Sequence, residues 1–330
     1  VIDASRAVGV VSKLMNDESK ENYTKEVRSE FEQIRETRKN KEIKPHLSIE
    51  EARKRKINID WKNYKPPIPK LNNNAVFNDY PLDELIDYID WSPFFHAWEL
   101  KGIFPRILND KKYGNEAKKI FSDGKELLDK IVSENLLNAK AVIGIYPAKS
   151  KNEFVFIDDV KFHFPRQTVD KGPDETNYCL ADFVAENNDF LGMFALTTGH
   201  GLEKIVKKFE NDNDDYNAIM SKVLADRLAE AFAERMHERV RREFWGYEGD
   251  DKMENDELIK EKYQGIRPAP GYPACPAHEE KDKIWSLLDA EKNTGIKLTE
   301  TRAMYPAASV CGWYLSNPNA QYFSVVSNYK

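Results

Sequence analysis

The sequence contains no glycine-rich phosphate-binding motif, no basic block and few cysteines. Neither a Gly-x-Gly-x-x-Gly run nor a P-loop occurs, which excludes the usual nucleotide-binding folds and Rossmann-type enzymes. Its 50 lysines and arginines are outnumbered by 56 acidic residues, so the formal net charge is -6. Because binding to a phosphate backbone depends on clustered positive charge, we expect no nucleic-acid partner.

Cysteines and long apolar stretches are also scarce. The three cysteines lie far apart at Cys179, Cys275 and Cys311, which argues against a disulfide framework and predicts a reducing, cytoplasmic compartment. The longest uncharged run, 303–329, is interrupted by prolines and glycine, so we expect no membrane span. The chain starts at Val1 without a methionine or a signal peptide, which suggests a piece of a longer protein.

Metal-ligand spacing is missing as well. Cys275-x-x-His278 is half of a zinc pattern with no second pair at a useful spacing, and the six histidines are scattered. The local sequence places no base beside Cys275, so a buried structural thiol is favoured over a nucleophile. We therefore expect no metal site in this chain.

The chain changes character along its length. Residues 1–15 open with an apolar stretch, and residues 16–56 are densely charged with few apolar anchors, which is typical of a solvated helical linker. Three prolines within 61–69 predict an extended segment. From Pro81 onward the pattern is that of a packed domain, long enough to bury a sizeable core.

Hydrophobic periodicity beyond Pro81 predicts a mixture of helices and strands. Apolar positions at helical spacing predict helices over 83–89, 115–135, 215–244 and 284–292. Apolar runs and alternation predict strands over 141–146, 154–158, 160–164, 178–185, 190–197, 309–315 and 322–327, the last two joined as a hairpin by a turn. Because the strands come in adjacent groups, we expect an α+β fold with an antiparallel sheet.

The most unusual segment is 267–276, RPAPGYPACP. Its four prolines fix the backbone at four places and remove four N–H donors, which leaves a stiff, non-helical track. Arg267 offers a planar fork for a carboxylate, Tyr272 an aromatic face, and Gly271 a point where backbone can approach a ligand closely. Composition alone leaves two interpretations open, a rigid surface connector and a ligand cradle.

An acidic stripe is expected on the helix over 215–244. Asp226, Glu230 and Glu234 recur every fourth residue, on the side opposite Leu224 and Leu228. Like charges at this spacing destabilise a helix slightly, so a role beyond helix stability is one explanation. A solvated face partly neutralised by nearby arginines is the other.

The proline-rich segment and four further blocks resemble the activation domain of cobalamin-dependent methionine synthases. The supporting blocks occur in order: 88–95 (YIDWSPFF), 177–184 (NYCLADFV), 226–234 (DRLAEAFAE) and 298–300 (LTE) through Trp313. Residues 1–11 (VIDASRAVGVV) resemble the end of the cobalamin-binding domain that precedes it in the family. The resemblance thus covers essentially the whole chain.

The resemblance implies a fold, a division of the chain and an activity. The fold would be a single C-shaped α+β domain with a twisted antiparallel sheet flanked by helices. Residues 1–25 would end the cobalamin-binding domain, 26–40 would form a charged linker, and 41–330 would form the activation domain. Family members bind S-adenosylmethionine along a shallow groove and donate its methyl group to cob(II)alamin during reductive methylation, with an electron supplied by flavodoxin or a flavoprotein reductase.

The resemblance also assigns residues. The S-adenosylmethionine site would comprise Asp90, Arg267, Ala269, Tyr272, Ala274, Tyr322 and Phe323. Because side chains alternate along a strand, we expect only one of Tyr322 and Phe323 to face the ligand. Asp90 has a structural alternative as a cap near Trp91, and Tyr322 has one as an ordinary core tyrosine.

Partners follow from the same resemblance. Asp226 and Glu230 would dock the cobalamin-binding domain of the same chain, which holds the cobalamin. Family enzymes bind zinc only in a homocysteine module that this chain lacks. Two other roles stay open: a module that senses S-adenosylmethionine without transferring its methyl group, and a docking scaffold for a flavoprotein.

Overall fold

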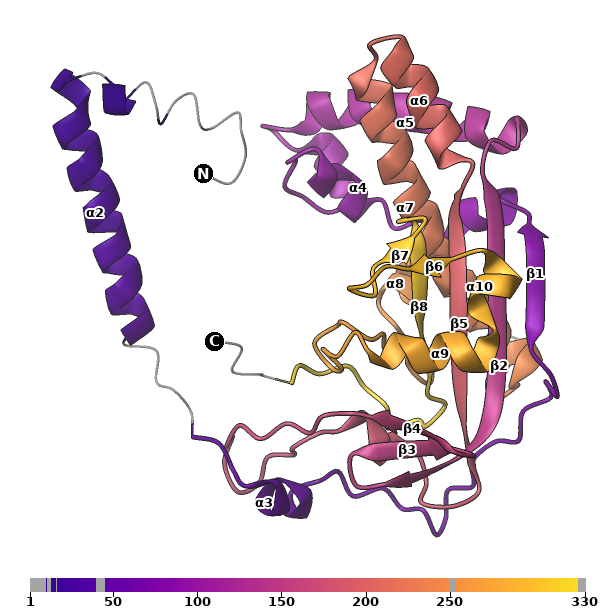
Figure 1. Ribbon diagram of the computed structural model, residues 1–330. Helices are drawn as coiled ribbons and strands as arrows, with labels where there is room; N and C mark the ends of the chain where they lie inside the picture. The colour runs from indigo at the N-terminus through magenta and orange to yellow at the C-terminus, as the bar shows by residue number, and fades with distance from the viewer. Residues whose placement is uncertain (1–9, 11–12, 16, 40–44, 250–252, 326–330) are drawn as a thin grey trace. The chain divides into compact units, whose positions relative to one another are not determined.

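The computed structural model describes residues 10, 13–15, 17–39, 45–249 and 253–325 (Figure 1). The chain separates into two compact units, one of residues 1–46 with 169–171, the other of residues 47–168 with 172–330. No helix of the described residues is long and apolar enough to cross a membrane.

The first unit contains one long helix, α2 (Asp17–Lys39), whose described side chains are mostly exposed. A charged, solvated helix is what the sequence of this region predicts. The predicted boundary between residues 25 and 26 lies inside α2, so no break in secondary structure marks it. The apolar stretch 1–9 lies outside the described residues, and its assignment to a preceding domain stays a prediction.

The second unit is built around a six-stranded antiparallel sheet ordered β4-β3-β2-β5-β8, with β1 also beside β2. Its strands are β1 (Ala75–Tyr80), β2 (Asn138–Lys151), β3 (Phe154–Ile157), β4 (Val160–His163), β5 (Asp189–His200) and β8 (Ser309–Tyr314). β5 pairs along one edge of β2, while β1 and β3 share the other edge at different ends. The expected α+β class and antiparallel sheet are confirmed.

The two faces of the sheet pack against different groups of helices. Side chains alternate along a strand, so Ala141 and Ile143 join one core cluster while Val142 joins the other. The first cluster also takes side chains from η1 (Asp83–Tyr88), α4 (Ser92–Ala97), α5 (Gly114–Ser133), α6 (Leu202–Asn211) and α7 (Asp215–Arg239). The second takes them from η3 (Leu180–Phe183), α9 (Glu280–Leu288) and α10 (Ala290–Thr294).

Shorter elements complete the second unit. They are α3 (Ile49–Lys54), η2 (Arg106–Asn109), the π-helical turn η4 (Val240–Phe244), α8 (Asn255–Ile259), and the two-stranded pair β6 (Lys297–Leu298) and β7 (Met304–Tyr305). The helix predicted over 215–244 therefore ends as α7 at Arg239 and continues as η4.

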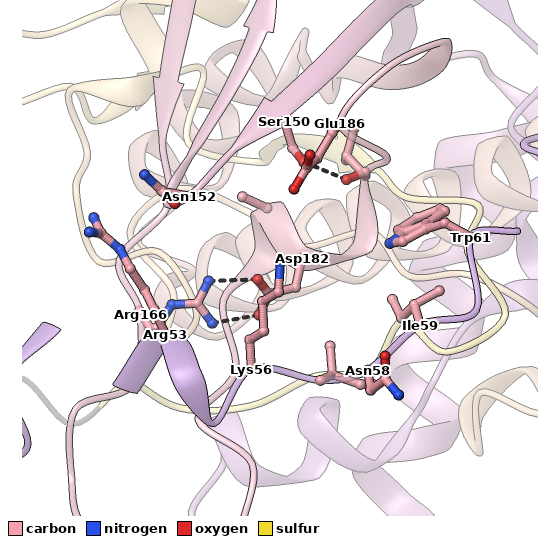
Figure 2. A pocket seen from close by; sticks show the side chains of 13 residues that line it. Arg53, Lys56, Asn58, Ile59, Trp61, Ser150, Asn152, Arg166, Asp182 and Glu186 are labelled. Carbon is pink, nitrogen blue, oxygen red and sulfur yellow. Dashed lines mark hydrogen bonds and ion pairs between the residues drawn. The ribbon is translucent and has the colours of Figure 1, made fainter. Parts of the chain in front are cut away.

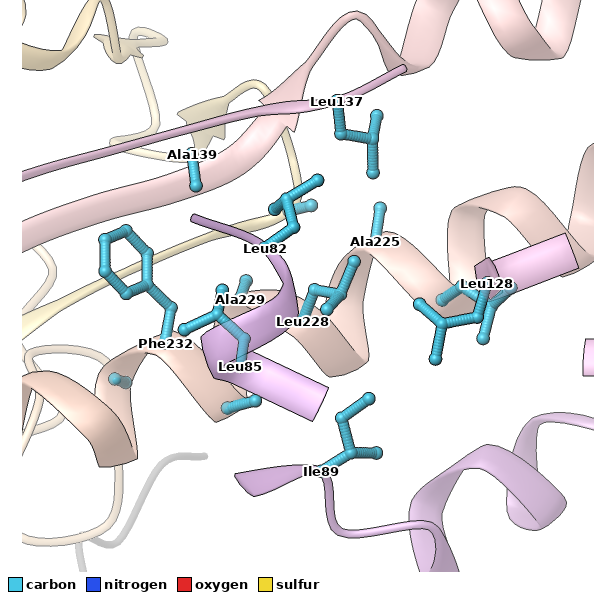
Figure 3. Packing of buried hydrophobic residues seen from close by; sticks show 14 of the residues in the cluster. Leu82, Leu85, Ile89, Leu128, Leu137, Ala139, Ala225, Leu228, Ala229 and Phe232 are labelled. Carbon is cyan, nitrogen blue, oxygen red and sulfur yellow. The ribbon is translucent and has the colours of Figure 1, made fainter. Parts of the chain in front are cut away.

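α7 is the central helix of the first core cluster. Its N-cap residue Asp214 accepts a hydrogen bond from the backbone of the first turn. Leu224, Leu228 and Phe232 are fully buried, and Figure 3 shows Leu228 in the same cluster of buried residues as Leu85 of η1. At about 1.5–3 kcal/mol for each large apolar side chain, this burial fixes the orientation of α7 and of the acidic stripe it carries.

Two of the predicted strands are wrong. Segment 178–185 contains the turn η3, because the Asp182 carboxylate accepts the N–H of Cys179 at 3.1 Å and closes a tight turn. The described part of 322–327 is irregular, because the free edge of β8 is already occupied. There Trp313 donates its N–H to the Pro268 carbonyl at 2.9 Å, and Ile266 forms a bridge with Leu315.

The helix predicted over 284–292 is also divided. Asp289 lies between α9 and α10 with φ of 47°, a left-handed conformation that ends α9. The side-chain amide of Asn293 then donates to the Leu288 carbonyl at 2.7 Å, so this carbonyl at the end of α9 has a hydrogen-bond partner. The sequence signal for this break was weak, since no glycine or proline lies there.

Candidate ligand groove

Two cavities lie beside α7 and share Glu230, Glu261 and Arg267 in their walls. The larger, of about 480 Å³, is mostly apolar and is lined by Phe194, Glu230, Glu261, Arg267, Pro268, Ala269, Tyr272, Pro273, Ala274, Val310, Tyr322, Phe323 and Ser324. The smaller, of about 300 Å³, is lined by Tyr88, Asp90, Pro93, Arg227, Glu230, Glu234, Asn255, Leu258, Ile259, Glu261 and Arg267. We call the combined space the groove.

The proline-rich segment is held against the edge of β8. The backbone hydrogen bond from Trp313 to Pro268 and the two between Ile266 and Leu315 fix its start. Gly312 makes this contact possible, because a Cβ at that position would lie 2.5 Å from the Pro268 carbonyl oxygen. The segment therefore presents Arg267 and the residues after it along one wall of the groove.

Gly271 has a different role from the one expected. Its φ is 92°, which disfavours any residue with a side chain, and its N–H donates to the Cys275 carbonyl at 2.8 Å to form a tight turn. A Cβ on Gly271 would lie 2.3 Å from the His278 ring. It is thus His278, and not a ligand, that needs the open space at this glycine.

Arg267 is fastened at both its backbone and its side chain. Its N–H donates to the Tyr322 hydroxyl at 3.0 Å. Its Nη1 lies 2.7 Å from a carboxylate oxygen of Glu234 and 2.6 Å from the Tyr263 hydroxyl. Burial disfavours the charge, but Glu234 and Tyr263 outweigh this and hold the pKa of Arg267 above its ordinary value. The side chain therefore stays cationic and keeps 19% exposure.

Tyr322 and Phe323 both line the groove, and which of them faces a bound ligand stays a prediction. The prediction assumed a strand, and the irregular backbone here imposes no alternation. Phe323 stacks on Tyr178 with ring centroids 5.7 Å apart. Val325 donates its N–H to the Pro273 carbonyl at 2.7 Å, which fastens the C-terminal segment to the proline-rich one.

Asp90 lies in the wall of the smaller cavity. One of its carboxylate oxygens accepts the N–H of Ser92 at 2.9 Å, which is the capping contact named as its structural alternative. Only the Oδ1 atom is used in this bond, so Asp90 both shapes the start of α4 and contributes to the groove.

Tyr272, Ala269 and Ala274 lie together in the larger cavity. Tyr272 is 59% exposed, so one side of its ring is open to solvent. Burial raises the pKa of its hydroxyl, and the nearby Glu230 carboxylate adds to this. The Ala269 carbonyl accepts the N–H of Tyr272 at 3.3 Å and is thus engaged within the turn.

The acidic stripe of α7 divides between solvent and core. Asp226 and Glu230 are exposed, but Glu234 is only 7% exposed. Glu230 lies in the walls of both cavities, Glu234 lies in one, and Asp226 lies in neither. The structure therefore brings Glu230 to the groove and leaves Asp226 on the adjacent surface.

Sequence reasoning missed several groove residues. Glu261 lines both cavities with φ of 52°, and burial raises the pKa of its carboxyl group. Tyr263 supports Arg267, while Phe194 and Val310 come from β5 and β8. No motif distinguishes these residues in the sequence, since they join the site only through the packing of the 261–267 loop and the sheet edge.

A separate, smaller cavity of about 220 Å³ lies near α3 and η3 and contains a second buried arginine (Figure 2). The guanidinium of Arg166 is 1% exposed and pairs with Glu153 through Nε at 2.9 Å. Its Nη1 and Nη2 lie 2.7 and 2.6 Å from the Asp182 carboxylate, and Nη1 also reaches the Asn177 carbonyl. Each of its three guanidinium nitrogens is thus used within the protein.

No group of three or more histidine, cysteine or acidic side chains that could hold a metal ion occurs among the described residues. Cys179, Cys275 and Cys311 are all buried thiols. Burial raises the pKa of Cys275 to about 12, so it is protonated at neutral pH.

Comparison with known proteins adds to this geometry. Residues 81–328 match the family described as vitamin B12 dependent methionine synthase, activation domain. The chain is also similar to a crystal structure of the MetH reactivation domain bound to AdoHcy. The identity is 46%, the TM-score is 0.82, and the match covers 85% of this chain and 90% of that one.

Proposed function

The chain belongs to the family of activation domains of vitamin B12-dependent methionine synthases, and from that premise we propose that its groove binds S-adenosylmethionine as a methyl donor. The observation that carries the proposal is the position of Arg267. Its Nη1 is held within the protein, while its Nε and Nη2 have no hydrogen-bond partner among the described residues and are not among the fully buried unpaired atoms. The residue itself lines both cavities of a largely apolar groove with acidic walls.

The ligand's carboxylate fits this arginine. A guanidinium binds a carboxylate best through two parallel N–H···O bonds, and the Nε–Nη2 edge of Arg267 offers such a pair. The related domain of known structure has AdoHcy bound, and that compound carries the same amino-acid end as S-adenosylmethionine. We therefore place the amino-acid end of the ligand beside Arg267.

The ligand's positive charges fit the acidic and aromatic walls. Glu230 and Glu261 lie beside Arg267 in both cavities, and Asp90 lies in the smaller one. Carboxylates here can pair with the ammonium group. The exposed ring of Tyr272 can face the sulfonium, an interaction worth about 0.5–2 kcal/mol.

The adenosine fits the apolar end of the larger cavity. Tyr322, Phe323, Ala274 and Val310 lie there together. Aromatic and aliphatic side chains of this kind bury the flat face of a base, while the backbone of the 269–274 turn offers polar groups at its edge. The two cavities share three lining residues, so together they can take an elongated ligand.

Bound in this way, the ligand would supply a methyl group to cobalamin held by the neighbouring domain of the parent enzyme. The sulfonium methyl and one electron from flavodoxin or a flavoprotein reductase, added to cob(II)alamin, yield methylcobalamin and S-adenosylhomocysteine. Asp226 and Glu230 project from α7 beside the groove, and we propose them as docking residues for that domain. We keep residues 41–330 as the activation domain.

Calorimetric titration of S-adenosylmethionine into this chain tests the proposal. We expect saturable one-to-one binding that Arg267→Ala weakens about 10- to 150-fold, the scale of a charged hydrogen bond. Arg302→Ala is a matched control, because Arg302 pairs with Asp282 at 3.0 Å and lines neither groove cavity. A folded chain without measurable binding would contradict the proposal.

Two related roles are separated by a second assay. A sensing module would bind S-adenosylmethionine without donating its methyl group, and a flavoprotein-docking scaffold would not need the ligand at all. Transfer of a labelled methyl group from S-adenosylmethionine to cobalamin in the full-length enzyme, lost with Arg267→Ala, supports the donor role. Binding without transfer would favour the sensing module.

A further inference from the structure

Arg267 is held by a buried acidic residue, and we propose that this residue, Glu234, is a positioning residue that selects ligands by their carboxylate. This proposal rests on the proposed function, because it concerns how the same groove recognises S-adenosylmethionine. Glu234 binds the Nη1 side of the guanidinium and leaves the Nε–Nη2 edge without a partner in a residue that lines the groove. The side chain would act through Arg267 rather than on the ligand.

Two oxygen-bearing side chains contact the same nitrogen of Arg267. Glu234 lies 2.7 Å from Nη1 and the Tyr263 hydroxyl lies 2.6 Å from it. Tyr263 in turn donates its own hydroxyl proton to Glu234 at 3.3 Å. Because Tyr263 and Glu234 are 8% and 7% exposed, this three-membered contact is shielded from water and holds one rotamer of Arg267.

The other edge of the guanidinium is left for a ligand. Neither Nε nor Nη2 of Arg267 has a hydrogen-bond partner among the described residues, and neither is among the fully buried unpaired atoms. The main-chain N–H of Arg267 is fixed by Tyr322 as well. A carboxylate that enters the groove therefore meets two N–H groups that are already oriented.

Two further buried side chains, Arg241 and His237, pack around the Glu234–Arg267 pair. The guanidinium of Arg241 is fully buried, lies 3.7 Å from the second carboxylate oxygen of Glu234, and pairs with Glu248 at 2.6 Å. The ring of His237, also fully buried, lies 3.5 Å from Nη1 of Arg267. Desolvation, together with Arg241 and Arg267, lowers the pKa of His237 well below its ordinary value. The neutral ring therefore adds a further contact on the Nη1 side of Arg267.

This arrangement has a consequence for specificity. An unanchored arginine loses rotamer freedom when it binds a ligand, whereas one that is anchored beforehand has lost it on folding. Loss of the Glu234 carboxylate should therefore lower the affinity only for ligands whose own carboxylate pairs with Arg267. We expect Glu234→Gln to reduce the affinity for S-adenosylmethionine by about tenfold.

The test compares two ligands that differ only in the carboxylate. S-adenosylmethionine and its decarboxylated analogue are titrated calorimetrically into the parent chain, Glu234→Gln and Glu243→Gln. Glu243 is a matched control, because it pairs with Arg239 at 2.7 Å and lines neither groove cavity. We expect Glu234→Gln to lower the affinity for S-adenosylmethionine but not for its decarboxylated analogue. Glu243→Gln should leave the affinity for both ligands unchanged.

Other outcomes overturn the assignment in distinguishable ways. Unchanged affinity of Glu234→Gln for S-adenosylmethionine removes the positioning role while leaving the proposed function intact. An equal loss for both ligands points to general damage of the groove and also removes it. Failure of the parent chain to bind S-adenosylmethionine overturns the proposed function, and the role of Glu234 with it.

A second variant guards against a folding defect in Glu234→Gln. Tyr263→Phe removes only the hydroxyl that contacts Nη1 of Arg267 and keeps the ring. We expect a smaller loss of affinity, about threefold, that is again confined to the carboxylate-bearing ligand. In the Arg267→Ala background, neither Glu234→Gln nor Tyr263→Phe should change the affinity further; an additional loss there would contradict an action through Arg267.

Discussion

Arg166 and Arg267 are both buried arginines held by acidic residues, but their guanidinium groups are used differently. Every guanidinium nitrogen of Arg166 contacts Glu153, Asp182 or a backbone carbonyl. Only Nη1 of Arg267 is engaged, and its other edge borders a groove. Both belong to cavities, yet only one of the two can offer a bidentate site to a ligand without breaking its own contacts.

The pairing of the guanidinium nitrogens distinguishes Arg166 from Arg267 better than burial or charge does. Arg166 is 1% exposed and Arg267 19%, so both are mostly shielded from water, and their acidic partners are buried as well. What differs is the count of satisfied donors. An arginine with all its nitrogens paired joins segments of the fold, whereas one with an open, oriented edge is prepared for an anion.

The largest effect on stability is expected for Arg166→Met. The change leaves Asp182 and Glu153 buried, with Asp182 deprived of both its guanidinium contacts. An uncompensated buried charge costs about 3–5 kcal/mol, so the free energy of unfolding should fall by that amount in urea denaturation. A loss below about 1 kcal/mol would mean that the network is not structural and would break the comparison.

Arg267→Ala should show the opposite division between stability and binding. S-adenosylmethionine binding should weaken by about 1.5–3 kcal/mol. The free energy of unfolding should fall less than in Arg166→Met, because Arg241 remains 3.7 Å from Glu234 and compensates part of its charge. Urea denaturation and calorimetry on the same two variants measure both quantities; equal destabilisation by both changes would contradict the division.

The pH dependence of stability tests the environment of His237, which lies beside Arg267. The pKa of buried His237 is well below 6.5 in the folded state, so below about pH 6.5 only the unfolded chain takes up this proton. Stability should therefore fall as the pH decreases through that range, by up to about 1.4 kcal/mol per pH unit from this group. In His237→Gln this pH-dependent loss of stability should vanish. His96 is exposed, so His96→Gln should keep the loss that comes from His237.

The smallest effect is expected for Arg53→Met. Arg53 also pairs with Glu153, at 2.6 Å, but its side chain is 35% exposed, and Arg166 remains to balance the carboxylate. Exposed ion pairs contribute little because water screens them. The urea midpoint should stay close to that of the parent chain. A loss as large as that of Arg166→Met would show that partial exposure does not distinguish the two arginines.

The sequence predicted the local elements where periodicity was strong and failed where partners came from elsewhere. α5, α7 and β5 follow the predicted segments closely, because their apolar spacing is long and regular. The strand predicted over 141–146 is confirmed as part of β2, which is longer and runs from Asn138 to Lys151. The strand predicted over 178–185 is wrong because Arg166, from a distant segment, pairs with Asp182 in the turn. The strand predicted over 322–327 is wrong because residues 266–268 already occupy the β8 edge.

The candidate site divides in the same way. The family resemblance of the sequence named Arg267, Tyr272, Ala269, Ala274, Asp90, Tyr322 and Phe323, and all of them line the groove. It also paired Asp226 with Glu230 as docking residues, but of these two only Glu230 reaches the groove. Glu261 and Tyr263 carried no sequence signal, since their place depends on how the loop before Arg267 packs on α7.

By itself, the sequence determined the α+β class and the chemical character of the segment 267–276, because apolar periodicity and proline are local properties of a chain. The tertiary structure decided which nitrogens of Arg267 are used and which remain open. That depends on Glu234 and Tyr263, which α7 and the loop after α8 bring together across 29 residues. The free edge of a side chain is set by its neighbours in space, and no local pattern encodes it.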